Sequence, residues 1–352
     1  MWYNIAMVRI RLMMFAAAAL MCATALRGAP GAAGSPSSVT RWATDAYPGF
    51  DREEEIVEGS KKTPRWFSWI NGPAKDDAAT QLAYAKECEA NGSWRAARRG
   101  YDALVREWPS SPEAPIAQEK LADLYFSHYL DYEEAFDEYK YLLDFYSAQC
   151  DYKAMVRRLW EVAKLMEEEG KTFVFFRFDN TIDVRRAFES VVRRAPGEDF
   201  TPDAMLRIAK LREDDDEYDR AVMVYENIRN LFPLTSEAKL AQHREGKARM
   251  FVLRKHEYNR QRCKDTIEFL RMMLATNLSP EVKSDFSAWL AEAVEKIEDD
   301  AFASAKFYDS RTRTRHSAIG AYERFLRDYP ASRHAEEARA RLNELQSEET
   351  AK

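Results

Sequence analysis

Apolar side chains recur along the chain at helical spacing, in a pattern that appears three times. Each copy begins with an alanine, continues with aliphatic or aromatic residues four, seven and eleven positions later, and then has a proline. The copies are Ala97, Tyr101, Leu104, Trp108 and Pro109; Ala221, Tyr225, Ile228, Phe232 and Pro233; and Ala318, Tyr322, Phe325, Tyr329 and Pro330. Residues at these offsets lie on one face of an α-helix, so each copy predicts a helix with one buried face.

The sequence after each proline predicts a turn and the start of another helix. Proline ends a helix because it lacks an N–H group, and the serine or threonine two residues later (Ser111, Thr235, Ser332) is a suitable N-cap. Weaker copies of the pattern start near residues 135, 184 and 263. Alanine, aromatic and proline at these offsets resemble the second half of a tetratricopeptide repeat. They predict an all-α, helical-repeat solenoid of five to six helix hairpins over residues 77–346.

Two insertions and a cap are predicted between and after these copies. Residues 170–180 interrupt the helical period and predict a loop that packs between neighbouring hairpins. Residues 281–309 keep a helical period and predict one long helix before the last hairpin. A charged helix over 335–345 would cap the array, as a solenoid requires for solubility, and residues 347–352 would form a tail.

The amino-terminal region predicts export. Residues 1–25 combine two arginines and an apolar run with an Ala-x-Ala cleavage site ending at Ala25, which is the pattern of a signal peptide. A transmembrane anchor is the first alternative, but the apolar run is short for a bilayer. Lipidation of Cys22 is the second, and the bulky Met21 before it is a poor match to a lipoprotein signal.

Residues 26–76 carry no helical period. A stretch rich in glycine, alanine, proline and serine predicts a flexible linker, and the aromatic-rich stretch that follows predicts an extended segment. So many aromatic side chains should not remain in water, and we expect the segment to lie against the first hairpin. The charged residues 51–55 would then face outward.

Composition and motifs argue against catalysis. Hydrophobic residues make up 46% of the 352 positions and the formal net charge is -6, which disfavours nucleic acid as a partner. The five histidines are scattered, and we find neither a glycine-rich phosphate loop nor the cysteine or histidine spacing of a metal site. The sequence therefore predicts a non-enzymatic protein with no catalytic residues, metal or cofactor.

The last repeat carries a more specific resemblance. Residues 301–308 (AFASAKFY), 317–319 (SAI) and 322–330 (YERFLRDYP) are similar to the carboxy-terminal repeat of the BamD family. The resemblance implies a periplasmic scaffold, peripherally associated with the inner face of the outer membrane, in the machinery that assembles outer-membrane β-barrels. Its partners would be the barrel-assembly protein, through its periplasmic domains, and unfolded barrel chains. The alternative is a periplasmic repeat protein of the Tol–Pal or peptidoglycan machinery, since those families share the Tyr-Pro-x-Ser pattern.

Two sets of candidate contact residues follow. Near the last repeat, the candidates for partner contact are Arg311, Arg313, Arg315 and Tyr322. On the first helices of the amino-terminal hairpins, a stripe beside the packing positions is a candidate peptide-binding surface: Leu82, Lys86, Glu89, Glu119, Asp123 and Phe126. Such arrays present their first helices on the inner curve. This stripe would suit an extended chain with aromatic ends, such as the last strand of an unfolded barrel, and the alternative is a merely solvated face.

Overall fold

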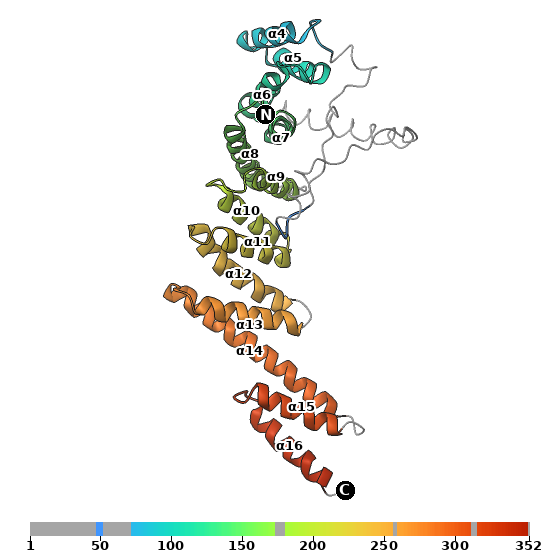
Figure 1. The fold of residues 1–352 in the computed structure, drawn as a ribbon, viewed down its shortest axis with the longest axis vertical. Coiled ribbons are helices and arrows are strands. Elements are labelled where there is room, and N and C mark those ends of the chain that lie inside the picture. Colours follow the sequence, from blue (N-terminus) through green and yellow to red (C-terminus); the bar gives the residue numbers. More distant parts are fainter. Residues whose placement is uncertain (1–46, 52–71, 173–179, 256–258, 311–314, 351–352) are drawn as a thin grey trace, which may run out of the picture. The chain divides into compact units, whose positions relative to one another are not determined.

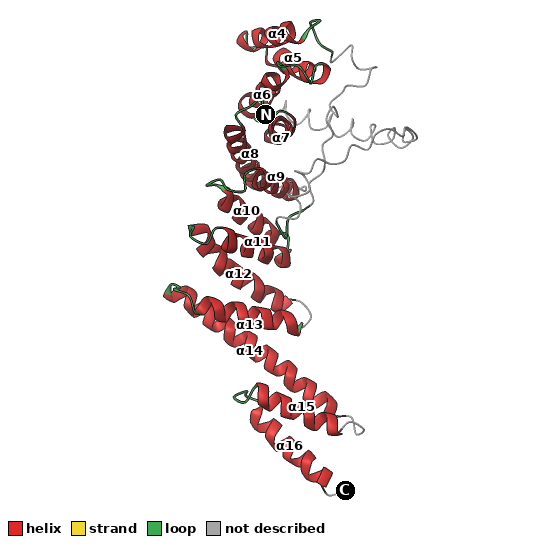
Figure 2. Cartoon of the chain, viewed as in Figure 1, coloured by secondary structure: helices red, strands yellow, loops and turns green. Residues whose placement is uncertain are grey.

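The structure is a computed structural model that describes residues 47–51, 72–172, 180–255, 259–310 and 315–350. Its regular secondary structure within these ranges is helical throughout, and they all belong to one unit, Ala43–Lys352 (Figures 1 and 2). The α-helices are α4 (Ala78–Ala90), α5 (Trp94–Glu107), α6 (Ala114–Leu124), α7 (Tyr132–Phe145), α8 (Tyr152–Thr172), α9 (Asn180–Arg194), α10 (Thr201–Asp214), α11 (Tyr218–Leu231), α12 (Ser236–Lys255), α13 (Arg260–Leu274), α14 (Pro280–Asp309), α15 (Arg315–Asp328) and α16 (Ala335–Thr350). A single π-helical turn, Tyr125–Tyr129, follows α6.

Consecutive helices pack as antiparallel hairpins. The pairs are α4 with α5, α6 with α7, α8 with α9, α10 with α11, and α12 with α13, and the second half of α14 forms a sixth pair with α15. Each second helix also packs on the first helix of the next pair. The predicted all-α solenoid of five to six hairpins is therefore confirmed, with six hairpins in the described ranges.

The repeated pattern sets the packing. Ala97, Ala221 and Ala318 are fully buried, and the tyrosines that follow them at +4 are at most 2% exposed. A small alanine lets the neighbouring helix approach closely, and the tyrosine ring then fills the space beside it. The helical register predicted from the sequence is confirmed at all three copies.

The serine or threonine after the proline caps the next helix, as predicted, at one copy only. Thr235 caps α12, its hydroxyl accepting a hydrogen bond from the Ala238 N–H at 3.2 Å. At the first copy, α6 starts two residues later than expected, at Ala114, with Glu113 in the N-cap position and Ser111 in the turn. In the third copy, Ser332 likewise lies in the turn before α16. The hydroxyl residues at these two sites therefore act as turn residues, which serine also favours.

The long helix α14 links two cores. Phe286, Ala293 and Ile297 pack in a cluster with α12 and α13, and Phe302 and Ala305, nearer its carboxyl end, pack with α15 and α16. The predicted helix over 281–309 is confirmed, and its second half is also the first helix of the last hairpin. The last helix, α16, continues to Thr350, so the expected tail at 347–352 begins inside it.

Other expectations concern regions that the structure describes only in part. The predicted loop at 170–180 lies mostly outside the described residues, since α8 extends to Thr172 and α9 begins at Asn180. The predicted signal peptide at 1–25 is wholly outside them. Within the described ranges, no helix combines the length and apolar character that a membrane span requires.

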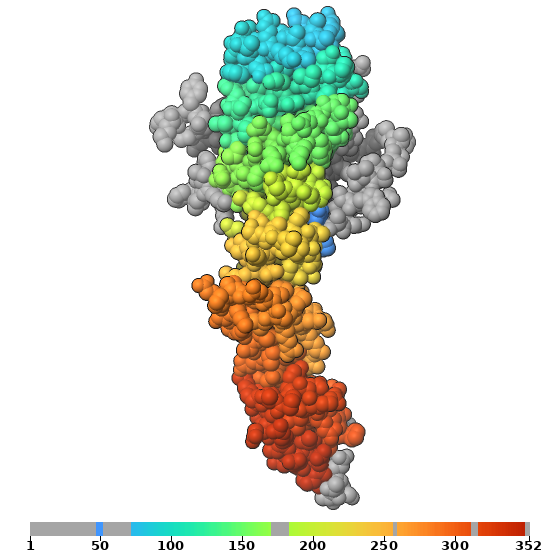
Figure 3. Space-filling view, turned by 60° about the vertical axis from the view of Figure 1, so that its left-hand side comes forward, coloured from blue at the N-terminus to red at the C-terminus, as the bar shows by residue number. Residues whose placement is uncertain are grey.

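The short segment Tyr47–Asp51 corrects one prediction. We expected the aromatic-rich stretch to lie on the first hairpin with Asp51 facing outward. Instead, Tyr47 joins the core cluster of α9, α10 and α11, and Asp51 turns inward onto arginines of these helices. The segment is visible as a blue patch beside α11 in Figures 1 and 3. The carboxylate decides the position, because it forms several charge-assisted hydrogen bonds there.

Candidate functional site

The predicted peptide-binding stripe begins with a residue that is not on the surface. Leu82 is only 8% exposed and belongs to the core between α4 and α5. The two helices approach closely at Gly100, where an added Cβ would come within 2.9 Å of the Ala85 Cβ. Leu82 packs in the same core, so its assignment to the exposed stripe was wrong.

Two acidic residues of the stripe are structural partners of the repeated tyrosines. Glu89 and Asp123 accept hydrogen bonds from the hydroxyls of Tyr101 and Tyr139, each at 2.5 Å. The same contact recurs in two later hairpins, from Tyr225 to Glu213 at 3.0 Å and from Tyr322 to Asp309 at 3.2 Å. A buried hydroxyl needs a partner, so these carboxylates hold the hairpins together. Burial and the neighbouring Asp309 raise the pKa of Tyr322 to about 12.

Three stripe residues remain candidates for the peptide-binding surface. Lys86 is exposed, whereas Glu119 and Phe126 are half-buried. Arg158 of α8 lies over the Phe126 ring, with its guanidinium carbon 4.9 Å from the ring centroid. Burial and the nearby Asp123 raise the pKa of Glu119. The structure therefore places a cation over the Phe126 ring, and the peptide-binding role of these three residues stays a prediction.

The partner-contact candidates are also changed by the structure. Tyr322 is 2% exposed and donates to Asp309, so it cannot serve as a surface contact. Arg311 and Arg313 lie outside the described residues, as does the side chain of Arg315. Immediately before them, however, Phe307 and Tyr308 are 52% and 38% exposed at the end of α14. Sequence reasoning did not select these two as contacts, although adjacent aromatic residues on one helix cannot both face the same core.

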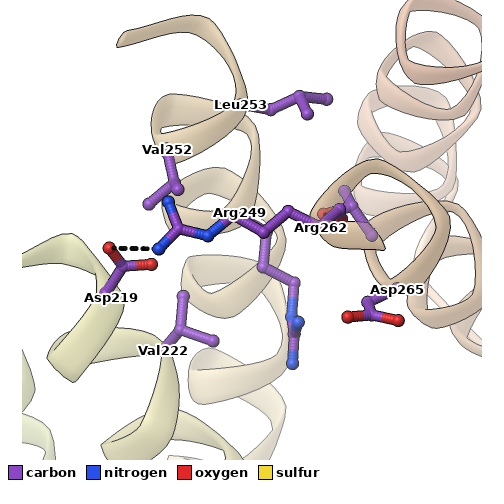
Figure 4. Close-up of a pocket in the computed structure, with 8 residues that line it drawn as sticks. Asp219, Val222, Arg249, Val252, Leu253, Arg262 and Asp265 are labelled. Atoms are coloured by element: carbon purple, nitrogen blue, oxygen red, sulfur yellow. Dashed lines mark hydrogen bonds and ion pairs between the residues drawn. The ribbon is translucent and has the colours of Figure 1, made fainter. Parts of the chain in front are cut away.

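The pocket shown in Figure 4 is too small for a substrate. It lies between α11, α12 and α13, encloses about 70 Å³, and is crossed by an ion pair of 3.2 Å between Arg262 and Asp219. That volume holds a few water molecules, whereas pockets for small ligands measure roughly 300–1,000 Å³. Across the described ranges, histidine, cysteine and acidic residues nowhere gather in a group that could hold a metal ion.

The most elaborate polar site is the one that receives Tyr47–Asp51. The segment forms a tight turn in which the Phe50 N–H donates to the Tyr47 carbonyl at 3.2 Å. Proline and glycine occupy the central positions and Gly49 has φ +94°, as in a type II turn. The rings of Tyr47 and Phe50 stack with centroids 5.1 Å apart.

Arginines from three helices surround the carboxylate that ends this turn. One carboxylate oxygen of Asp51 accepts a hydrogen bond from Arg185 of α9 at 2.8 Å. The other accepts from Arg220 of α11 at 2.8 Å and lies 3.2 Å from Arg212 of α10. The Asp51 N–H donates to Glu189 at 2.9 Å, and Arg193 donates to the Asp51 carbonyl. We call these four arginines, together with Glu189, the arginine cradle.

The arginine cradle is part of a larger buried network. Arg212 and Glu189 are both fully buried and joined by a hydrogen bond of 2.8 Å, and Arg212 also binds Glu217. Sequence reasoning missed this site, although it left a signal. Arg185, Glu189 and Arg193 are spaced by four residues, so alternating charges follow one face of α9 in a helix that must be packed on both sides.

The acidity of Asp51 gives a prediction. Burial alone would raise its pKa, but hydrogen bonds and charges from Arg185 and Arg212 outweigh burial and lower it from 3.8 to about 2. The stability that this carboxylate contributes is therefore complete above pH 4 and is lost as the pH falls through about 2. Carbon-13 NMR of the Asp51 carboxyl measures this directly, and a midpoint at or above 4 would contradict the described contacts. Arg185, Arg212 and Arg220 contact its carboxylate. Arg193 donates to its carbonyl, and Glu189, Asp215 and Glu217 pair with the arginines around it.

A match to a known repeat family supports the repeat assignment for one hairpin. Residues 203–235, which span α10, α11 and the following turn, match the tetratricopeptide repeat family. No curated protein matches the sequence. Among solved structures, the chain is similar to a tetratricopeptide repeat protein from Parabacteroides merdae ATCC 43184 (13% identity, TM-score 0.28, 76% of this chain and 98% of that one). It is also similar to MamA from Desulfovibrio magneticus RS-1 (15% identity, TM-score 0.26, 56% of this chain and 97% of that one).

The helix pairs and the family match define the class of the protein. It is a tetratricopeptide-repeat-like α-solenoid, a fold suited to protein–protein interaction. Extended arrays of this kind offer long surfaces for other proteins.

Proposed function

We propose that this protein is a non-enzymatic scaffold of the cell envelope that acts in the assembly of outer-membrane β-barrels. One observation carries the proposal: the last repeat, whose sequence resembles the BamD family, exposes Phe307 and Tyr308 at the end of α14. Exposed adjacent aromatic residues are typical anchors of protein interfaces. The basic loop 311–315 follows them directly in sequence and would supply the polar rim.

The proposed partners are the periplasmic domains of the barrel-assembly protein, at the last repeat, and unfolded barrel chains elsewhere on the array. The proposed location is the periplasm, at the inner face of the outer membrane. Support comes from the predicted signal peptide and from the resemblance. A repeat protein of the Tol–Pal or peptidoglycan machinery is the second candidate, because the Tyr-Pro-x-Ser pattern also fits it.

Copurification from detergent-solubilised envelopes tests the partner. We expect the double variant F307A/Y308A to recover about tenfold less barrel-assembly protein than the unmodified chain, since truncating two interface anchors costs at least about 1.4 kcal/mol. The matched control is L231A/L234A, which removes two exposed leucines near the end of α11. Equal recovery with both double variants would refute the role of the last repeat. Recovery of peptidoglycan-linked proteins instead would favour the second candidate.

The mass of the mature protein tests export separately. Cleavage after Ala25 predicts an amino terminus at Leu26 in protein taken from the periplasmic fraction. Intact-mass spectrometry measures this to within one residue. A chain that begins with diacylglyceryl Cys22 would show that the protein is lipidated, and an uncleaved chain would contradict the signal peptide.

A further inference from the structure

We propose that the arginine cradle on α9, α10 and α11 is a peptide-binding site for turns in a partner protein of the form aromatic-Pro-Gly-aromatic-acid. Residues 47–51 would occupy it as an internal ligand, which a partner's turn displaces. The inference does not depend on the envelope role, because it rests only on the contacts of this segment.

The arginine cradle and the neighbouring Asn227 contact the backbone of the turn as well as its side chains. The Asn227 side chain donates to the Pro48 carbonyl at 3.2 Å, Arg193 donates to the Asp51 carbonyl, and Glu189 accepts from the Asp51 N–H. Main-chain hydrogen bonds give affinity in peptide recognition, and side-chain contacts give specificity. The guanidinium carbon of Arg193 also lies 5.6 Å from the centroid of the Phe50 ring, so the aromatic residue and the carboxylate are recognised together.

The glycine is selected by close approach. An added Cβ at Gly49 would lie 3.0 Å from the Arg220 carbonyl oxygen and 3.2 Å from the Met223 Cβ. Its positive φ also disfavours every other L-residue. A turn with any other residue at this position therefore cannot approach α11 as closely as the turn Tyr47–Asp51 does.

The surrounding arginines select a carboxylate. Arg185, Arg212 and Arg220 each have a nitrogen within 3.2 Å of an Asp51 carboxylate oxygen. Glu189, Asp215 and Glu217 also pair with arginines of the site. Because three acidic residues remain in place, displacing the turn does not leave four arginines uncompensated.

The position of the turn at the surface makes exchange feasible. Arg220 is half exposed and Pro48 is exposed, so the edge of the site is open to another chain. The turn belongs to the same chain as the site, so a partner's turn must compete with an intramolecular ligand.

Fluorescence anisotropy with the full-length mature chain tests the proposal. The probe is a fluorescein-labelled synthetic peptide of residues 45–53 (DAYPGFDRE). We expect it to bind the variant F50A/D51N, whose internal ligand is disabled, at least about tenfold more tightly than the unmodified chain. Gly49→Ala in the chain is a second variant that unseats the turn and retains every charge, and it should show the same gain. Circular dichroism verifies the fold of each variant.

Matched controls locate the binding. Probe peptides carrying Gly49→Ala or Asp51→Asn should bind the F50A/D51N chain about tenfold more weakly than the parent peptide. Adding Arg220→Ala to that chain should weaken binding similarly, whereas Arg254→Ala, an exposed arginine that pairs with Glu292 on other helices, should leave it unchanged.

Three results would overturn the proposal. Equal binding to the unmodified and disabled chains would place the peptide elsewhere. Absence of binding to both variants would show that residues 47–51 are a fixed structural element. A concentration-dependent dimer of the unmodified chain that F50A/D51N abolishes would show that the occupant is a second copy of this chain and not a partner protein.

Discussion

Replacing Arg212 by methionine is expected to lower the free energy of unfolding by about 3–5 kcal/mol, the range for removing one member of a buried ion pair. Arg212 is fully buried and is the nearest cation to the buried Glu189, at 2.8 Å. Methionine keeps most of the volume but leaves Glu189 with the more distant Arg193 and Arg185, at 3.5 and 3.9 Å. Burial already raises the pKa of Glu189, so its charge depends on these partners.

Urea unfolding followed by circular dichroism measures the change. The matched control is Arg220→Met, which removes an arginine that contacts the same network from a half-exposed position and should cost about 1 kcal/mol or less. The free energy of unfolding should fall less in the double variant R212M/E189M than in R212M alone, because the double variant has no unpaired buried carboxylate. Similar losses in R212M and R220M would contradict the buried network.

Replacing Tyr225 by alanine is expected to destabilise the fourth hairpin by about 3–5 kcal/mol, the range for truncating a fully buried aromatic residue. Its ring fills the core between α10 and α11, and its hydroxyl donates to Glu213 at 3.0 Å. Tyr225→Phe keeps the ring and loses only the hydrogen bond, so it should cost about 1 kcal/mol. The equivalent alanine substitutions at Tyr101 and Tyr322 should have similar effects in their own hairpins.

Hydrogen exchange is the measurement of choice here, because repeats in a solenoid open locally. The amides of α10 and α11 should lose protection first in Tyr225→Ala, and those of α14 and α15 should change less. The matched control is Leu231→Ala, which removes an exposed leucine from the same helix. Its stability should stay within about 0.5 kcal/mol of that of the unmodified chain. Uniform loss of protection along the array would show that the repeats unfold as one unit.

Much of the fold could be predicted from the sequence because its determinants are local. The alanine, tyrosine and proline offsets specify where each second helix packs and ends, and all six second helices lie where the pattern predicts. Helical period also predicted the length of α14, since Phe286 and Ile297 lie on one continuous face. Local patterns gave the ends of elements less well, as the continuation of α16 to Thr350 shows.

The candidate contact surfaces could not be assigned from the sequence in the same way. Leu82 and Lys86 are one helical turn apart, yet packing against α5 buries Leu82 and leaves Lys86 exposed. The sequence placed the acidic residues Glu89 and Asp123 on an exposed helix face. In the structure, each accepts a hydrogen bond from the hydroxyl of a tyrosine on the next helix. Exposure and hydrogen-bond partners depend on the neighbouring helix, and the period of one helix does not contain that information.

The sequence by itself determined the repeated hairpins and their register. Only the tertiary structure decided where the turn Tyr47–Asp51 binds. Asp51 meets Arg185 and Arg220 across 134 and 169 positions of sequence, and no periodicity relates residues so far apart. Helix formation follows from spacings of three and four residues, whereas the arginine cradle forms only after three helices have packed and brought its arginines together.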